Sequence, residues 1–187
     1  MKRVFIDCGA WLGNSTIHFY KTFPKAKNYQ YYAFECNPHL FKKLRKRIAR
    51  SHINSTIDTR AVWVNDDVIN FRIGPDMYSE SASIISSKRI KHYIPRNDLY
   101  VKCFDFSSWM NQLIAPGDVC VIKMNIEGAE YAVLNKMIKD NTIKKVTLLL
   151  ISWHYRKINL PESEHLALIE KLNVLNIKHE VWSLEHE

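Results

Sequence analysis

Short apolar runs rich in β-branched and aromatic residues alternate along this sequence with segments in which apolar residues recur at helical spacing. The strand-like runs are Arg3–Asp7, Gln30–Glu35, Thr56–Arg60, Val119–Asn125, Val146–Trp153 and His179–Leu184. The helical patterns are Ser15–Thr22, Pro38–His52, Phe106–Leu113, Ala129–Lys139 and Glu162–Leu175. Strands that alternate with helices are typical of βαβ units. The sequence therefore predicts an α/β fold, with a mostly parallel sheet and helices on both of its faces.

Two further segments lie between the third strand and the third helix. Val68–Ile73 has the composition of an additional strand, whereas Gly74–Asn97 lacks periodicity and predicts a long functional loop. The length of 187 residues fits one domain over residues 1–187, either complete or part of a longer protein. The longest strongly apolar stretch, Val146–Trp153, is far shorter than the ~20 residues that cross a bilayer. Without a signal peptide after Met1, we expect a soluble, cytoplasmic protein.

The formal net charge of +8 favours anionic partners, nucleic acid among them. Much of the excess lies in one predicted helix, in Lys42, Lys43, Arg45, Lys46, Arg47 and Arg50. Leu44 and Ile48 fall between these residues at helical spacing, so the apolar stripe packs inward and the basic side chains face water. A solvated helix face is favoured over a nucleic-acid surface, but both readings stay open.

A glycine turn joins the first strand to the first helix. Gly9 and Gly13 permit a tight turn and close approach of a ligand, and the N–H groups that open the helix can bind an anion. Asn14 or Ser15 is suited to cap that helix. The G-x-G-x-x-G pattern of dinucleotide sites would need glycine at positions 11 and 14, and neither position has one. The turn therefore predicts a ligand other than NAD.

Glu35 ends the second predicted strand, next to this turn. A carboxylate at that place can accept hydrogen bonds from both ribose hydroxyls of an adenosine. The alternative is a surface acid stabilised by the start of the next helix. Because the glycine turn precedes it, the ligand-binding interpretation is favoured.

Four segments resemble the FkbM-like family of SAM-dependent methyltransferases. They are Phe5–Gly13, Ala33–Pro38, Ala61–Trp63 and Ile122–Glu130, and the last is the most specific. The resemblance implies a Rossmann-like class I methyltransferase fold, here short of room for the usual last strand. It also implies S-adenosylmethionine as cofactor and O-methylation, often of sugars, lipids or other natural products.

The same resemblance assigns a set of cofactor-binding positions. Glu35 would hold the ribose, Ala61 would lie near the adenine, and the turn after strand one would cradle the methionyl end. The implied cofactor set is Asp7, Gly9, Ala10, Gly13, Asn14, Ser15, Glu35, Ala61 and Asn125. Asn125 stands where the family usually has aspartate, and asparagine cannot act as a general base.

Methylation of a hydroxyl needs a group that takes its proton. His154 is the first candidate, because it follows a strand and an ordinary imidazole pKa suits the task; a merely structural role stays open. Glu127 can hold substrate, act as the base or ligate a divalent ion. Lys123 lies inside an apolar strand and so needs a partner, either Glu127, a substrate oxygen or a buried acid such as Asp105.

The substrate-binding candidates are Ser81, Glu130 and Tyr155. Glu127, Glu130 and His154 have metal-ligand chemistry but no tight ligand spacing, so metal dependence stays open. The sequence predicts a SAM-dependent O-methyltransferase acting on a sugar, a glycan or a similar small hydroxylated acceptor. An RNA ribose O-methyltransferase and a catalytically silent SAM-binding domain are the alternatives.

Overall fold

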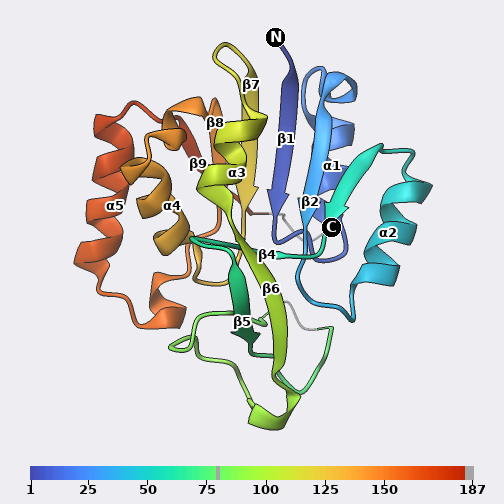
Figure 1. Ribbon diagram of the computed structural model, residues 1–187, viewed down its shortest axis with the longest axis vertical. Helices are drawn as coiled ribbons and strands as arrows, with labels where there is room; N and C mark the ends of the chain where they lie inside the picture. Colours follow the sequence, from blue (N-terminus) through green and yellow to red (C-terminus); the bar gives the residue numbers. More distant parts are fainter. Residues whose placement is uncertain (79–80, 184–187) are drawn as a thin grey trace.

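A parallel sheet forms the centre of the computed structural model, which describes residues 1–78 and 81–183 (Figure 1). Within these residues its strands lie in the order β3-β2-β1-β7-β8-β9, and every neighbouring pair is parallel. Their bounds are β1 Arg3–Cys8, β2 Gln30–Phe34, β3 Ser55–Asp58, β7 Val119–Met124, β8 Leu148–Ile151 and β9 His179–Val181. The strand order reverses between β1 and β7, which marks the edge where such sheets bind ligands. The predicted Rossmann-like α/β architecture is confirmed.

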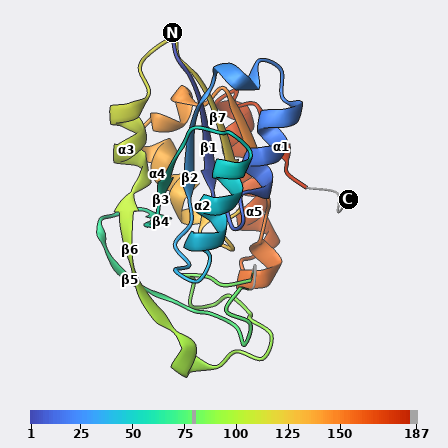
Figure 2. The same ribbon diagram turned by 90° about the vertical axis from the view of Figure 1, so that its right-hand side faces the viewer.

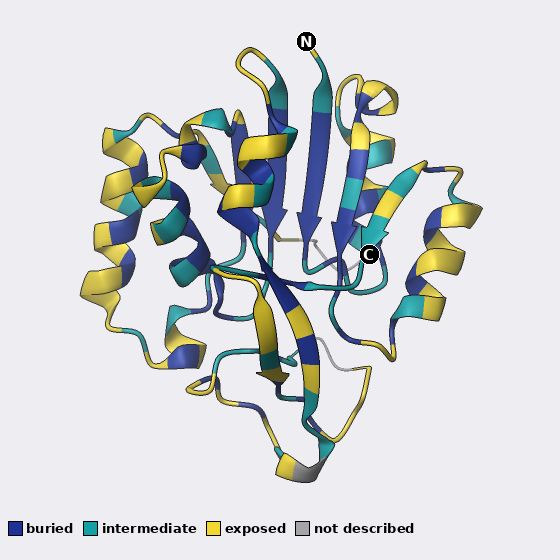
Figure 3. Cartoon of the chain, viewed as in Figure 1, coloured by how far each residue is buried: buried dark blue, intermediate teal, exposed yellow. Residues whose placement is uncertain are grey.

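Helices cover both faces of this sheet (Figure 2). Helices α1 (Asn14–Thr22) and α2 (Phe41–Arg50) pack on one face, and α3 (Phe106–Leu113), α4 (Glu130–Lys139) and α5 (Glu162–Val174) pack on the other. Alternation along β1 shows why: Val4 and Ile6 join the cluster of α3, α4 and α5, whereas the Phe5 ring stacks on Phe19 of α1 at 3.9 Å. Strands buried on both faces are therefore apolar almost throughout, and Figure 3 shows them as the buried centre.

A second, smaller sheet lies beyond the carboxyl edge of the first (Figure 1). It consists of β4 (Ala61–Trp63), β6 (Leu99–Asp105) and β5 (Asp67–Phe71), with β4 parallel and β5 antiparallel to the central β6. The predicted strand after β3 is real but belongs to this sheet. Sequence analysis missed β6, although Val101 and Cys103 are buried while Tyr100 and Lys102 are exposed, which is the alternation of a half-buried strand.

Some boundaries differ from the prediction. Helix α2 begins at Phe41 rather than at Pro38, because residues 38–40 form a turn. Strand β9 ends at Val181, and Leu184 lies outside the described residues. In the described part of the chain no strand follows β9 in the sheet.

The segment predicted as a long loop is confirmed in large part. Between Gly74 and Asn97 the described residues contain only a short 3₁₀ turn, at Pro95–Asn97, and an isolated bridge joins Arg72 to Ser83. Over residues 1–78 and 81–183, no helix combines the length and the apolarity that a membrane span requires.

Candidate functional site

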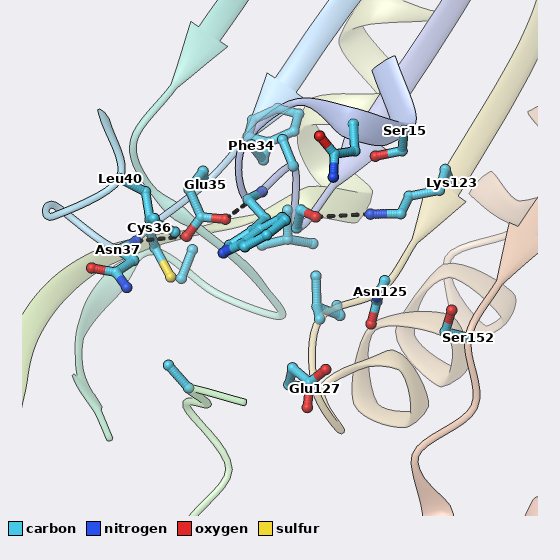
Figure 4. A pocket seen from close by; sticks show the side chains of 18 of the residues that line it. Ser15, Phe34, Glu35, Cys36, Asn37, Leu40, Lys123, Asn125, Glu127 and Ser152 are labelled. Carbon is cyan, nitrogen blue, oxygen red and sulfur yellow. Dashed lines mark hydrogen bonds between the residues drawn. The ribbon is translucent and has the colours of Figure 1, made fainter. Parts of the chain in front are cut away.

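A cavity of about 1020 Å³ opens at the carboxyl edge of the central sheet (Figure 4). Three strand ends contribute to its wall: the turn at Gly9 after β1, Glu35 after β2 and Asn125 after β7. Phe71 and Ala82 close another side from the second sheet and the long loop. Small-molecule sites commonly enclose about 300–1,000 Å³, so this cavity has room for a nucleoside-sized ligand and a second small molecule.

Gly9 brings the turn after β1 directly against the end of β7. Its φ is +80°, and a Cβ at this position would lie 1.9 Å from the carbonyl oxygen of Asn125. The Asn125 N–H donates to the Cys8 carbonyl at 3.0 Å, so the two strand ends are tied together. Only glycine fits this contact, which explains the residue at the first position of the turn.

Glu35 presents its carboxylate to the cavity, and two backbone groups hold it there (Figure 4). Oε2 accepts the Trp11 N–H and Oε1 accepts the Asn37 N–H, each at 2.8 Å. Burial raises the pKa of this carboxyl, and the two N–H bonds act in the opposite direction. Since a carboxylate has about four acceptor positions, both oxygens keep capacity for a ligand's hydroxyl groups.

Asp7 and Lys123 form an ion pair at the cavity, which Lys123 lines and Asp7 supports from behind. They lie opposite each other in the register of β1 and β7, and Lys123 Nζ is 3.0 Å from Asp7 Oδ1. Lys123 also donates to the Gly9 carbonyl at 2.8 Å, while Asp7 accepts the hydroxyls of Ser15 at 2.6 Å and Thr16 at 2.7 Å. This network joins β1, β7 and α1 under the glycine turn.

The predicted need of Lys123 for a partner is confirmed, and the partner is a buried acid, but it is Asp7 rather than Glu127 or Asp105. Glu127 does not pair with it, and Asp105 pairs instead with Lys136 at 3.3 Å. Asp105 also accepts the N–H of Ser108 at 2.9 Å, as the cap of α3.

Glu127 lines the cavity from the turn that follows β7, in a left-handed backbone conformation with φ of 57°. Its carboxylate contacts His154 Nε2 at 3.1 Å and is hydrogen-bonded by the Lys88 ammonium. The other imidazole nitrogen of His154, Nδ1, lies 2.9 Å from Glu130 Oε1. Lys88, Glu127, His154 and Glu130 therefore form a row in which cations and carboxylates alternate. Glu127 is the member of the row that lines the cavity.

These contacts decide the ionisation of the cluster. Burial opposes the charged forms of Glu127 and His154. For Glu127, the bonds to His154 and Lys88 outweigh burial and lower its pKa to about 2. In the same way, the bonds to Glu127 and Glu130 outweigh burial and raise the pKa of His154 to about 9. The expectation of an ordinary imidazole pKa is therefore wrong, because two carboxylates hold the ring as an imidazolium at neutral pH. His154 does not line the cavity; it lies behind Glu127.

Comparison with protein families supports the assignment that the sequence suggested. The profile of the Methyltransferase FkbM domain matches residues 7–178, from within β1 to the segment just after α5. The chain belongs to the FkbM methyltransferase family. A search of the curated proteins and a search of the solved structures each found no match.

Most of the expected cofactor positions of this FkbM domain lie on the cavity. Those that line it are Gly9, Ala10, Asn14, Ser15, Glu35, Ala61 and Asn125. Asp7 and Gly13 do not reach it. Asp7 is fully buried in its ion pair, and Gly13 faces the side chains of Leu44 and Ile48. Both residues shape the wall of the cavity from behind rather than touching its contents.

The expected substrate residues of the FkbM domain do not line the cavity. Glu130 is fully buried and accepts the N–H groups of Ile126 and Gly128 at 2.8 Å each, so it shapes the turn that carries Glu127. The Tyr155 ring stacks on His165 at 4.3 Å, beside α5. The Ser81 carbonyl lies 3.5 Å from Lys88 Nζ, and the next residue, Ala82, lines the cavity instead.

No metal centre is assembled in the part of the FkbM domain that the structure describes. Over residues 1–78 and 81–183, no group of three or more His, Cys, Asp or Glu side chains is arranged to hold a metal ion. Glu127, Glu130 and His154, the candidates from the sequence, are bonded to one another instead.

Sequence analysis of the FkbM domain missed three residues that shape the site. Trp11 has φ of 47°, which turns its N–H toward Glu35, and its indole Nε1–H donates to the Tyr78 carbonyl at 3.0 Å. Asn37 donates its amide to the Met77 carbonyl at 2.8 Å. Both residues lie inside segments that resemble the family, Phe5–Gly13 and Ala33–Pro38, so the sequence could have pointed to them. Lys88 lies in the aperiodic loop, where no sequence signal singles out one lysine.

Asn125 provides a test of fit for a bound cofactor. Its Oδ1 is buried and has no hydrogen-bond partner within the described residues, although the residue lines the cavity. Buried acceptors are nearly always satisfied, so this oxygen calls for a donor that a ligand would supply. A ligand with hydroxyl groups for Glu35 and a donor for Asn125 fits the site, and S-adenosylmethionine has both.

Proposed function

We propose that this FkbM methyltransferase uses S-adenosylmethionine and methylates a hydroxyl oxygen of a sugar or a similar small acceptor. The observation that carries the proposal is the Glu35 carboxylate, which faces the same cavity as the Gly9 turn. Two backbone N–H groups hold that carboxylate and leave it able to accept two ribose hydroxyls.

Three parts of the wall suit three parts of the cofactor. Glu35 would bind the ribose, and Asn125 Oδ1 would accept from the ammonium of the methionyl group. Helix α1 has Gly13 at its N-cap without a side-chain cap, so N–H groups of its first turn are free to bind the methionyl carboxylate. Anionic Glu35, after β2, would thus recognise the ribose, and neutral Asn125, after β7, would recognise the methionyl ammonium.

Bound S-adenosylmethionine would supply an electrophilic methyl group on a positively charged sulphur. Glu127 is the second acid on the described wall of the cavity, and its low pKa keeps it ionised. Its carboxylate would accept a hydrogen bond from the acceptor hydroxyl, direct the oxygen lone pair to the methyl carbon and take up the proton. The new oxygen–carbon bond would form as the sulphur–carbon bond breaks, and S-adenosylhomocysteine would leave with that electron pair. Because Glu127 is a weak base, it then releases the proton to water. His154 acts on the acceptor only through Glu127.

Calorimetric titration tests the cofactor. We expect the wild-type protein to bind S-adenosylmethionine and S-adenosylhomocysteine and not NAD. Glu35→Gln should weaken binding by about tenfold or more, because it replaces a charged acceptor by a neutral one. Glu164→Gln, at an exposed position on α5, is the matched control and should bind as the wild type does. Equal affinity of Glu35→Gln and wild type would contradict the proposed ribose contact.

Methylation of an RNA ribose is a second candidate, favoured by the charge of α2. Its six basic residues are exposed, and none pairs with an acid in the described part of the chain. Like charges at helical spacing destabilise a helix, so an anionic partner would reduce the repulsion between these side chains. Arg47 belongs to this helix and also lines the cavity, where it bonds Asn14 Oδ1 at 2.6 Å.

An acceptor screen separates the candidates. Transfer to an RNA oligonucleotide that falls steeply with salt, and that Lys42→Gln with Lys46→Gln weakens, would favour RNA. Transfer to a glycan with little dependence on salt would favour the first proposal. Cofactor binding with no transfer to any acceptor in a broad screen would indicate a catalytically silent domain.

A further inference from the structure

Lys88 is a buried lysine in the long loop between β5 and β6. Its side chain is 1% exposed, and its ammonium hydrogen-bonds the Glu127 carboxylate. Lysine is almost never fully buried unless it is paired, because an ammonium loses its hydration there. Burial lowers the pKa of Lys88 and the Glu127 carboxylate opposes that shift. The loop therefore places the Lys88 ammonium against Glu127, the acid on the described cavity wall that we assign to the acceptor side.

The backbone around Lys88 is anchored to the second sheet. The Arg72 guanidinium, directly after β5, donates to the carbonyls of Ile85 at 3.2 Å, Ser86 at 2.6 Å and Lys88 at 2.9 Å. The same guanidinium lies over the Tyr93 ring, 4.2 Å from its centroid. One side chain thus holds three carbonyl groups within residues 85–88 and ties the backbone of Lys88 to the second sheet.

The same loop also holds the backbone of Glu127. The Ser83 hydroxyl donates to the Glu127 carbonyl at 2.7 Å and accepts the Ile85 N–H at 3.0 Å. A left-handed conformation at a non-glycine residue is strained and persists only where its surroundings enforce it. Ser83 and Lys88 supply that enforcement, one on the main chain and one on the carboxylate.

We propose that Lys88 is a positioning residue for methyl transfer, which holds the Glu127 carboxylate in its orientation at the cavity wall. The inference rests on the proposed function, and Lys88 acts on the reaction only through Glu127. The charged groups that face Glu127 are Lys88, His154 and Lys157, whose Nζ lies 3.9 Å away, and Glu130 bears on it through His154. Lys157 is 57% exposed on its side chain, so it cannot replace a buried cation.

The placement of Lys88 separates two kinetic effects. Lys88 does not line the cavity, and Glu35 and Asn125 belong to other elements, so cofactor affinity should not depend on it. Without Lys88, Glu127 loses a buried opposite charge at bonding distance, and its pKa must rise. The rate of the chemical step and its acid limb should then change while the binding constant for S-adenosylmethionine stays the same.

Lys88→Met tests this directly, with Lys91→Met, an exposed lysine of the same loop, as control. We expect kcat to fall at least tenfold and S-adenosylhomocysteine affinity to stay within twofold. The acid limb of kcat should move up by about one pH unit or more, the effect of removing one opposite charge within about 4–6 Å. Lys88→Arg should recover part of the rate. Wild-type kcat and an unshifted acid limb in Lys88→Met would overturn the proposal.

Two further measurements cover the remaining outcomes. In a Glu127→Gln background, Lys88→Met should reduce kcat no further. This double variant leaves no unpaired carboxylate, so it can be measured even if Lys88→Met alone folds poorly. An additional, independent loss of kcat would overturn the proposal. Carbon-13 NMR of the Glu127 carboxyl, assigned with Glu127→Gln, follows its titration without any cofactor or acceptor. An upward shift in Lys88→Met shows that Lys88 acts on the Glu127 carboxylate even if the proposed methyl transfer fails, and an unchanged midpoint refutes the inference.

Discussion

Lys123→Met lowers the free energy of unfolding by about 3–5 kcal/mol, the usual cost of removing one partner from a buried ion pair. The reason is Asp7, which is 0% exposed and has Lys123 as its cation at 3.0 Å. Two hydroxyls, from Ser15 and Thr16, bond the other oxygen of Asp7 and cannot replace the lost charge. Urea unfolding followed by circular dichroism measures the change.

The double variant Asp7→Asn with Lys123→Met is the control for this prediction. It removes both charges together, so most of the lost stability should return. If Lys123→Met alone unfolds at the wild-type urea concentration, or if the double variant is less stable than either single one, the ion pair does not support the cavity as described.

Glu127→Gln should reduce methyl transfer about a hundredfold or more, the common contribution of a positioned proton acceptor. The amide keeps the shape of the side chain but cannot take the hydroxyl proton. Cofactor affinity should fall far less, because Glu35 and Asn125 remain in place on the cavity wall. Single-turnover transfer measured beside calorimetry separates the two effects.

Glu170→Gln, at an exposed position on α5, provides the matched control for the loss of one carboxylate. It should transfer methyl groups at the wild-type rate. A Glu127→Gln variant as fast as wild type would remove Glu127 from the reaction, and with it the proposed role of Lys88. Loss of cofactor binding and transfer in equal measure would instead indicate that Glu127 supports the cofactor.

The central sheet could be predicted because its strands obey a simple rule. A parallel strand covered on both faces is a short, continuous apolar run, and Arg3–Cys8 and Val119–Met124 read that way. The strand ends at Gly9, Glu35 and Asn125 could be brought together from the same reasoning, since parallel strands end at one edge of a sheet. Strand β6 escaped notice, because its Lys102 and Tyr100 face water and interrupt the apolar run.

The partners of the charged residues could be predicted only in part. Asp7 and Lys123 lie on adjacent strands near the same edge, and the register of β1 and β7 makes them neighbours. Their pairing could not be predicted, because the sequence analysis gave no strand order. The pKa of His154 could not be predicted either, because it depends on Glu127 and Glu130, which a turn folds back onto the ring. Lys88 reaches Glu127 across 39 positions from a loop without periodicity, and no local pattern encodes such a contact.

Two residues on the cavity wall depart from the backbone conformations that non-glycine residues usually adopt. Trp11 and Glu127 both adopt left-handed backbone conformations, as do Lys25, His52, His92, Asn141, Asn159 and Asn176 at other places in the chain. In each case the strain aims a group at the cavity: the Trp11 N–H holds Glu35, and the Glu127 carboxylate faces the proposed acceptor.

A crystal structure of the protein with S-adenosylhomocysteine tests the central claim most directly. We predict the ligand in the cavity at the carboxyl edge, with both ribose hydroxyls within hydrogen-bond distance of the Glu35 carboxylate and the adenine near Ala61. S-adenosylhomocysteine bound elsewhere, or a cavity without ligand in crystals grown at saturating concentration, would contradict the assignment of this site to the cofactor.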